Sequence, residues 1–227
     1  MTNKNQEAEH IESESTTHAE GFIIKNINKF LTALLAIVVV VIAVIAYGHH
    51  IVEPKEAKAQ EALYPSQNYF MQQQFKLALE GDSISSIGFI AITKKYGNTP
   101  AGNLAHAYAG LCYKKLGLND KAIKELEAFH AEDKQIAPAI LAATANCYAD
   151  AGQTEKAAGM LIDAADRANA VTLSPIYLLN AGQLYQAAKQ YQKAIATFEQ
   201  IKKEYPNSQL GRGIERYIEQ AKAQAGV

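Results

Sequence analysis

The 227-residue chain contains no tryptophan, only six prolines and only two cysteines, and its formal net charge is −1. Without a basic face, the chain offers no surface of the kind that binds nucleic acid. Two cysteines are too few for a disulfide framework. The scarcity of proline, together with abundant Ala, Lys, Glu, Gln and Leu, favours helices throughout. We therefore predict an all-α protein.

Charged residues are absent from residues 30–47, which read FLTALLAIVVVVIAVIAY. A helix of about 20 apolar residues crosses a hydrocarbon core about 30 Å thick. A cleavable signal peptide would have a shorter apolar core followed by a small-residue cleavage site, and a buried core helix would hold more polar residues than Thr32. The uncharged stretch continues to residue 52 if both histidines in it are neutral, so we predict a transmembrane helix at residues 30–52.

The flanks of this helix set its expected orientation. Residues 1–29 hold five acidic residues and three lysines among Ser, Thr and Asn, which predicts a disordered acidic tail. Lys25 and Lys29 immediately precede the span. Lys55 and Lys58 follow it at a greater distance, so the positive-inside comparison is nearly even. Proximity of the lysines alone favours a cytoplasmic N-terminus.

Residues 53–98 predict a helical stalk that ends in a degenerate repeat. Pro54 suits the first turn of a helix. We expect that helix to break at Pro65, because proline disrupts a helix interior, and a second helix to follow. Gly81 and Asp82 then predict a turn.

A pattern of small and bulky residues recurs three times in residues 99–206. Each copy has a small residue, a tyrosine three positions later, an alanine nine positions after the tyrosine, and apolar residues four and seven positions beyond that alanine. The copies are Gly110, Tyr113, Ala122, Leu126 and Phe129; Ala145, Tyr148, Ala157, Leu161 and Ala164; and Gly182, Tyr185, Ala194, Phe198 and Ile201. Gly117 and Gly152 mark the turn between two helices in the first two copies, and Lys189 stands there in the third. One helix pair cannot cover its own apolar face, so the copies must stack.

This pattern resembles the tetratricopeptide repeat, and the resemblance implies an α-solenoid of about three to four helix pairs. In place of the family's usual tryptophan stand His106, Leu141 and Leu178. A degenerate fourth copy at residues 66–96 keeps only Phe89 and Ile92 in register. Residues 207–227 predict a C-terminal capping helix with one apolar face.

The order of these parts is also similar to the YfgM-like proteins of bacterial envelopes. The similarity rests on the short tail, the single N-terminal span, a helix ending at Gly81-Asp82, and the segment KKYGNTPAGNLAHAYAGLCYKKLG. Members of that family are ancillary subunits of the SecYEG translocon that work beside the membrane-anchored periplasmic chaperone PpiD. The resemblance implies a single-pass protein of the bacterial inner membrane with periplasmic repeats. Its implied partners are translocon subunits, that chaperone and emerging secreted chains.

Histidines are the first candidates for chemistry. His49 and His50 lie at the expected membrane boundary, and His106 and His130 lie in the repeats without a cysteine or carboxylate at metal-ligand spacing. The sequence contains no phosphate loop, nucleophile elbow or zinc motif. We therefore predict no enzyme, no metal site and no cofactor.

The two cysteines, Cys112 and Cys147, each precede the repeat tyrosine by one residue. Equivalent positions on stacked helices are about 8–10 Å apart. A disulfide needs Cα atoms within about 7 Å. We predict two buried free thiols.

The family's pattern places the first helix of each pair on an inner surface, and there we expect a partner-binding groove. The candidate residues are Leu104, Ala107, Leu111, Lys114, Ala139, Ala142, Asn146, Ala149, Ile176, Leu179, Gln183 and Gln186. The mix of small apolar residues with Asn and Gln suits an extended or helical apolar segment, and the alternative is that some of these residues merely face solvent. We expect the side chains of Leu111, Asn146 and Leu179 to point away from the core between repeats. Only Asn146 matches the clamp by which some family members hold a terminal carboxylate.

These features predict a membrane-anchored protein-interaction module. Two alternatives stay open. One is a structural adaptor of a cell-division or secretion complex that binds no client, and the other is an organellar import receptor with cytosolic repeats.

Overall fold

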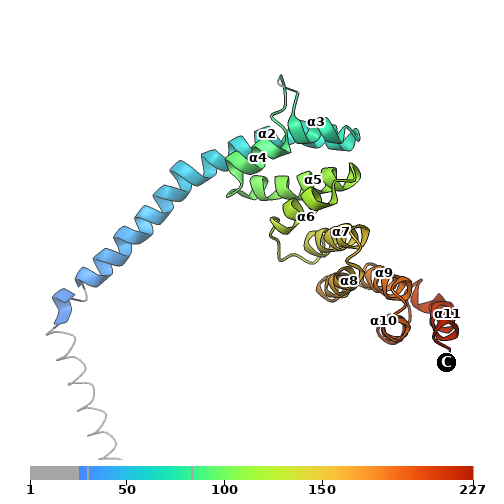
Figure 1. Ribbon diagram of the computed structural model, residues 1–227. Coiled ribbons are helices and arrows are strands. Elements are labelled where there is room, and N and C mark those ends of the chain that lie inside the picture. The colour runs from blue at the N-terminus through green and yellow to red at the C-terminus, as the bar shows by residue number, and fades with distance from the viewer. Residues whose placement is uncertain (1–25, 30, 83, 227) are drawn as a thin grey trace, which may run out of the picture. The chain divides into compact units, whose positions relative to one another are not determined.

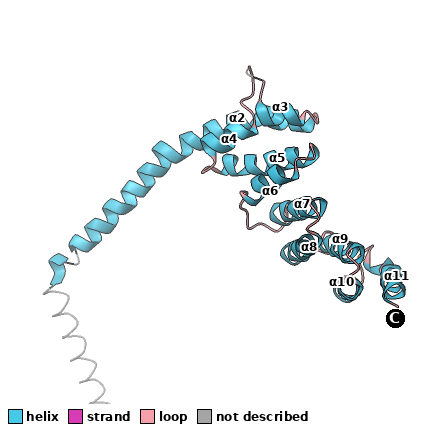
Figure 2. Cartoon of the chain, in the orientation of Figure 1, coloured by secondary structure: helices cyan, strands magenta, loops and turns pink. Residues whose placement is uncertain are grey.

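The computed structural model describes residues 26–29, 31–82 and 84–226 (Figure 1). Residues 1–25, most of the predicted acidic tail, therefore lie outside the described residues. The described part of the chain forms helices and no strand, which confirms the all-α prediction (Figure 2). It divides into two compact units, Met1–Pro54 and Lys55–Val227.

The first unit contains an apolar helix that is long enough to cross a membrane. The helical run that includes it starts at Asn26, and none of the residues in its most apolar stretch is buried. Side chains such as Val40 and Ile45 are 61% and 65% exposed. A helix that is apolar on all sides is suited to lipid rather than to water. Its length and composition fit the predicted single-pass anchor, and a π-helical turn, Gly48–Val52, follows it.

Nearly all of α2 (Glu53–Met71) belongs to the second unit, and this helix runs through Pro65 without ending. The predicted break at this proline is therefore wrong. An interior proline removes one backbone hydrogen bond and costs about 3 kcal/mol in an isolated helix. Here the adjoining Ser66 is fully buried, and its hydroxyl lies 2.8 Å from that of Ser86. Packing of α2 against the rest of the unit thus offsets the penalty.

Two short helices follow α2: α3 (Phe75–Glu80) and α4 (Phe89–Tyr96). Loop 81–88 separates them and projects from the helices (Figure 1). Buried residues of α2, α3 and α4 share one hydrophobic cluster with α5 (Pro100–Lys115). Glu56 Oε2 also accepts a hydrogen bond of 3.1 Å from the N–H of Ala101, at the start of α5.

The register of this N-terminal part differs from the predicted one. The positions that match the later repeats are Ser66, Tyr69, Gln73 and Ala78. Tyr69 stands 44 positions before Tyr113, whereas Phe89 stands 37 positions before Leu126. The difference is an insertion of seven residues, and loop 81–88 contains it. The degenerate repeat is therefore a complete repeat whose second helix is split into α3 and α4.

Gly81 and Gly88 lie at the two ends of loop 81–88, which come close together. Gly81 and Gly88 have φ values of +83° and +77°, which favour glycine. A Cβ on Gly81 would lie 2.2 Å from the carbonyl oxygen of Ser86. Next to Gly81, the Asp82 carboxylate accepts hydrogen bonds from three backbone N–H groups of the loop and, at 2.6 Å, from the Tyr69 hydroxyl. These hydrogen bonds hold residues 82 and 84–86 in a defined arrangement.

Three regular helix pairs follow, as predicted. After α5 they comprise α6 (Asn119–Glu127), α7 (Ile136–Asp150), α8 (Thr154–Ala168), α9 (Ser174–Ala187) and α10 (Tyr191–Glu204). Each helix packs on the helix before it and the helix after it, which makes this unit an α-solenoid (Figure 1). The predicted turn residues Gly117, Gly152 and Lys189 have φ values of +73°, +79° and +60°. Gln73 has the same left-handed backbone at φ +60°, in the turn between α2 and α3.

The predicted close approach of the paired helices is confirmed. A Cβ on Gly182 would lie 2.2 Å from Cε1 of Phe198, and a Cβ on Gly110 would lie 2.5 Å from Cγ of Leu126. Both bulky partners are almost fully buried. Glycine at these positions lets the second helix of the pair rest directly on the first.

The capping helix is shorter than predicted. A 3₁₀ turn, Gly211–Gly213, precedes α11 (Glu215–Ala225). Ile214, Ile218 and Ala221 are buried, and α11 packs on α10. The helix thus covers the apolar end of the last repeat, as its sequence pattern indicates.

Candidate partner-binding surface

The predicted groove residues lie on α5, α7 and α9, the first helices of the three regular repeats. Burial separates them into three groups. Ala139, Ile176 and Gln183 are exposed. The half-buried residues are Leu104, Leu111, Lys114, Asn146, Ala149, Leu179 and Gln186. Ala107 and Ala142 are buried at 3% and 7% exposure.

The burial pattern corrects the expectation that Leu111 and Leu179 point away from the core, and it also removes two alanines from the reachable surface. Ala107 and Ala142 belong to hydrophobic clusters between helices, so a partner cannot reach them. Leu111 and Leu179 are half-buried and pack against the same two clusters. The sequence pattern could not separate a large apolar residue on the surface from one that completes the contact between repeats.

The reachable part of the predicted groove is consequently smaller and more polar. Ile176 remains 44% exposed. Gln186 donates a hydrogen bond of 2.7 Å to Gln224 of α11, so its amide is already engaged. Ala139 and Gln183, with Ile176, are the predicted residues most accessible to a partner.

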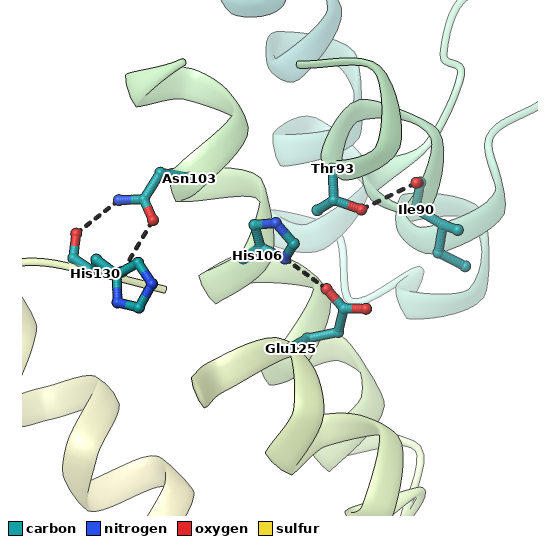
Figure 3. A network of polar contacts seen from close by, with 6 residues as sticks. All are labelled: Ile90, Thr93, Asn103, His106, Glu125 and His130. Carbon is teal, nitrogen blue, oxygen red and sulfur yellow. Dashed lines mark hydrogen bonds and ion pairs between the residues drawn. The ribbon is translucent and has the colours of Figure 1, made fainter. Parts of the chain in front are cut away.

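The two repeat histidines hold helices and loops in place (Figure 3). His106 Nδ1 lies 2.7 Å from Glu125 Oε2, which connects α5 to α6. His130 contributes its backbone, since its carbonyl oxygen accepts from Asn103 Nδ2 at 2.7 Å and its N–H donates to Asn103 Oδ1 at 2.9 Å. No group of three or more His, Cys, Asp or Glu side chains in the described part of the chain could hold a metal ion.

Cys112 and Cys147 are buried free thiols, as predicted. Burial raises the pKa of the Cys112 thiol to about 12, and it raises the pKa of Cys147 as well. A thiol needs to ionise to act as a nucleophile. Both cysteines therefore serve as small apolar packing residues.

One repeated contact was not predicted from the sequence. In each regular repeat a lysine ammonium lies over the ring of the repeat tyrosine. The pairs are Lys121 with Tyr113 at 5.7 Å, Lys156 with Tyr148 at 3.6 Å, and Lys193 with Tyr185 at 5.4 Å from the ring centroid. The signal was present, because the lysine follows its tyrosine by eight residues in all three copies.

Residues 177–208 match the family model of the tetratricopeptide repeat. This match covers most of α9, all of α10 and the turn after it, which together form the third predicted copy. No curated protein sequence matches the chain. The pairs α5–α6 and α7–α8 carry the same residue pattern as the matched pair. The chain therefore contains a tetratricopeptide repeat within an all-helical solenoid, a fold that typically serves as a protein-interaction module.

Proposed function

We propose that this protein is a membrane-anchored interaction module that binds a protein segment on the face formed by α5, α7 and α9. The observation that carries the proposal is that Ile176 and Gln183 are both exposed and lie two turns apart on one face of α9, in the repeat that matches the family model. An exposed apolar residue and an amide on the same helix face suit an apolar segment whose backbone also needs hydrogen-bond partners. The apolar N-terminal helix supports the membrane anchor.

The resemblance to YfgM-like proteins supports a finer proposal, in which the repeats lie in the periplasm beside the SecYEG translocon. Translocon subunits, a membrane-anchored chaperone and emerging secreted chains are then the partners. An anchor confines the binding face to the membrane and so raises its effective concentration there. Protease added to spheroplasts should digest residues 53–227 and spare the N-terminal tail; protection of the repeats would contradict this orientation.

Site-specific photocrosslinking in membranes tests the binding face. A photoreactive residue in place of Gln183, exposed on α9, should capture a defined partner. The matched control places the same photoreactive residue at Gln192, which is exposed on the second helix of the same pair and should not capture the partner. Combining Ala139→Glu with Ile176→Glu places two charges on the binding face and should abolish capture from position 183. The fold should survive, because both residues are exposed and lie in the first turns of their helices, where an acidic residue is tolerated. Equal capture from positions 183 and 192 would contradict the proposal.

The structural-adaptor alternative is favoured by the burial of Ala107 and Ala142 and by the packing of Leu111 into the core. These contacts reduce the apolar surface that an unfolded client could use. The same crosslinking experiment separates the two functions, since a client-binding groove captures nascent secreted chains and an adaptor captures only folded membrane partners.

A further inference from the structure

The second helix of the first regular repeat stops early. Helix α6 has 9 residues, whereas α8 has 15 and α10 has 14. The chain that follows α6 forms no helix until Ile136, and the two hydrogen bonds between Asn103 and the His130 backbone hold it against α5 (Figure 3).

A hollow of about 180 Å³ lies at this place. Its walls come from α6, the loop after it, α7 and α8. The lining residues are Leu126, Glu127, Phe129, Ala131, Ala137, Ile140, Leu141, Thr144, Met160 and Arg167. The single hydroxyl among them, on Thr144, already donates to the Ile140 carbonyl at 2.8 Å. A dry cavity of about 150 Å³ is enough to hold a benzene molecule, so this hollow has room for one large apolar side chain.

Two charged groups flank the apolar walls. Glu127 and Arg167 are both exposed. Glu127 Oε1 accepts the Tyr148 hydroxyl at 2.6 Å, which fixes the carboxylate and leaves its second oxygen available. Within the described ranges, no carboxylate forms an ion pair with the Arg167 guanidinium. The lining thus includes a carboxylate oxygen that can accept a hydrogen bond and a guanidinium group that can donate one.

We propose that this hollow binds a leucine- or phenylalanine-sized side chain of an extended protein segment. The backbone N–H of the segment donates to Glu127, and its carbonyl oxygen accepts from Arg167. The inference rests on the proposed protein-binding function and adds to it a second site, built from α6, α7 and α8 rather than from the α5, α7 and α9 face.

Methionine provides a direct readout. The chain has three methionines, and Met160 lines the hollow whereas Met71 is 70% exposed at the end of α2. The full chain in detergent micelles, labelled with [¹³C-methyl]methionine, is titrated with N-acetyl-leucinamide, whose leucine side chain lies between an amide N–H and a carbonyl group in the required order. We expect a saturating shift of the Met160 methyl resonance and none for Met71. N-acetylglycinamide, which lacks the side chain, should produce no shift of Met160.

Variants of the lining sharpen the test. Ala137→Leu fills the hollow and should abolish the Met160 response, and Ala131→Leu fills it from the loop side if the first variant does not fold. Arg167→Gln should weaken binding up to about tenfold, because it removes the charged donor to the segment's carbonyl oxygen. Arg212→Gln is the matched control, because Arg212 is exposed in the 3₁₀ turn before α11 and should leave binding unchanged.

The inference is overturned if Met160 does not respond up to the solubility of the probe. It is also overturned if N-acetylglycinamide shifts the Met160 methyl resonance as much as N-acetyl-leucinamide does, or if the Met71 resonance shifts together with that of Met160. If position 183 captures a partner but the Met160 resonance does not shift, binding at the hollow is contradicted and binding at the α9 face stands. If the Met160 resonance shifts but position 183 captures nothing, binding at the α9 face is contradicted and binding at the hollow stands.

Discussion

In the third regular repeat, α10 runs unbroken for 14 residues, whereas in the N-terminal repeat the equivalent helix is split into α3 and α4 by loop 81–88. Both repeats keep the same elements before that point: a small residue, a tyrosine, a left-handed turn and a buried alanine. The difference shows which elements of the repeat are necessary. The first helix, the turn and the first half of the second helix fix the stacking.

The second half of the helix can be interrupted because the insertion is closed at its base. In the N-terminal repeat Gly81, Gly88 and the Asp82 hydrogen bonds hold the ends of the loop together. The third regular repeat has no such device and relies on Phe198 packing directly on Gly182. One repeat is thus stabilised by polar closure of a loop and the other by close packing of helices.

Filling the close contact of the third repeat should have the largest effect. Gly182→Leu overpacks the site against Phe198 and should lower the free energy of unfolding by about 1–3 kcal/mol or more. Thermal unfolding of the full chain in detergent, followed by circular dichroism, measures it. Gly159→Ala is the control, because a Cβ at this position would meet no other atom within 4 Å, and should stabilise α8 by about 0.5–1 kcal/mol. An unchanged melting temperature for Gly182→Leu would mean that the repeat register is wrong.

Opening the loop of the N-terminal repeat should give a smaller and pH-dependent effect. Hydrogen bonds from the Ser85 and Tyr69 hydroxyls and from loop amides hold the pKa of the Asp82 carboxyl well below its ordinary value of 3.8. A lowered pKa means that the stabilisation is complete above about pH 4 and is lost as the pH falls below that value. Asp82→Asn should therefore lower the melting temperature at pH 7, and its difference from the wild type should shrink at pH 3.

Asp163→Asn on α8 is the matched control, since Asp163 is exposed and accepts no hydrogen bond in the part of the chain that the structure describes. If the melting temperatures of Asp82→Asn and the wild type differ by the same amount at pH 7 and at pH 3, the loop does not depend on the ionised carboxylate.

Removing one lysine over a repeat tyrosine should have the smallest effect. Lys156→Met at the 3.6 Å contact should cost about 0.5–1 kcal/mol, the usual size of an exposed cation–π interaction. Lys121→Met, at 5.7 Å, should cost less. Urea unfolding of both variants measures the difference. If the two variants are equally stable, distance to the ring does not determine the contribution of these lysines.

The sequence predicted the regular repeats well because their pattern reflects local packing. Gly110 and Gly182 are small where another helix touches them, and the residues four positions after Tyr113, Tyr148 and Tyr185 lie in turns between helices, as the pattern indicated. Burial of both cysteines followed from the same register. Each of these features depends on residues within one or two helices of each other.

Features that depend on more distant contacts were predicted less well. The continuity of α2 through Pro65 depends on packing against residues such as Ser86, twenty positions later. The burial of Ala107 and the packing of Leu111 depend on residues of α6 and α7, which a pattern on α5 alone does not reveal. The hollow beside Arg167 arises because α6 is short, and the spacing of its apolar residues gave no sign of its early end.

The nearest-neighbour packing of α5 to α11 also determines how the chain can assemble during synthesis. Contacts between helices that follow one another have low contact order, so closing them costs little chain entropy and folding is fast. Translation proceeds from the apolar helix toward α11, so each new helix meets a surface that is already complete. Such vectorial growth leaves at most one apolar face uncovered at a time, and α11 covers the last one.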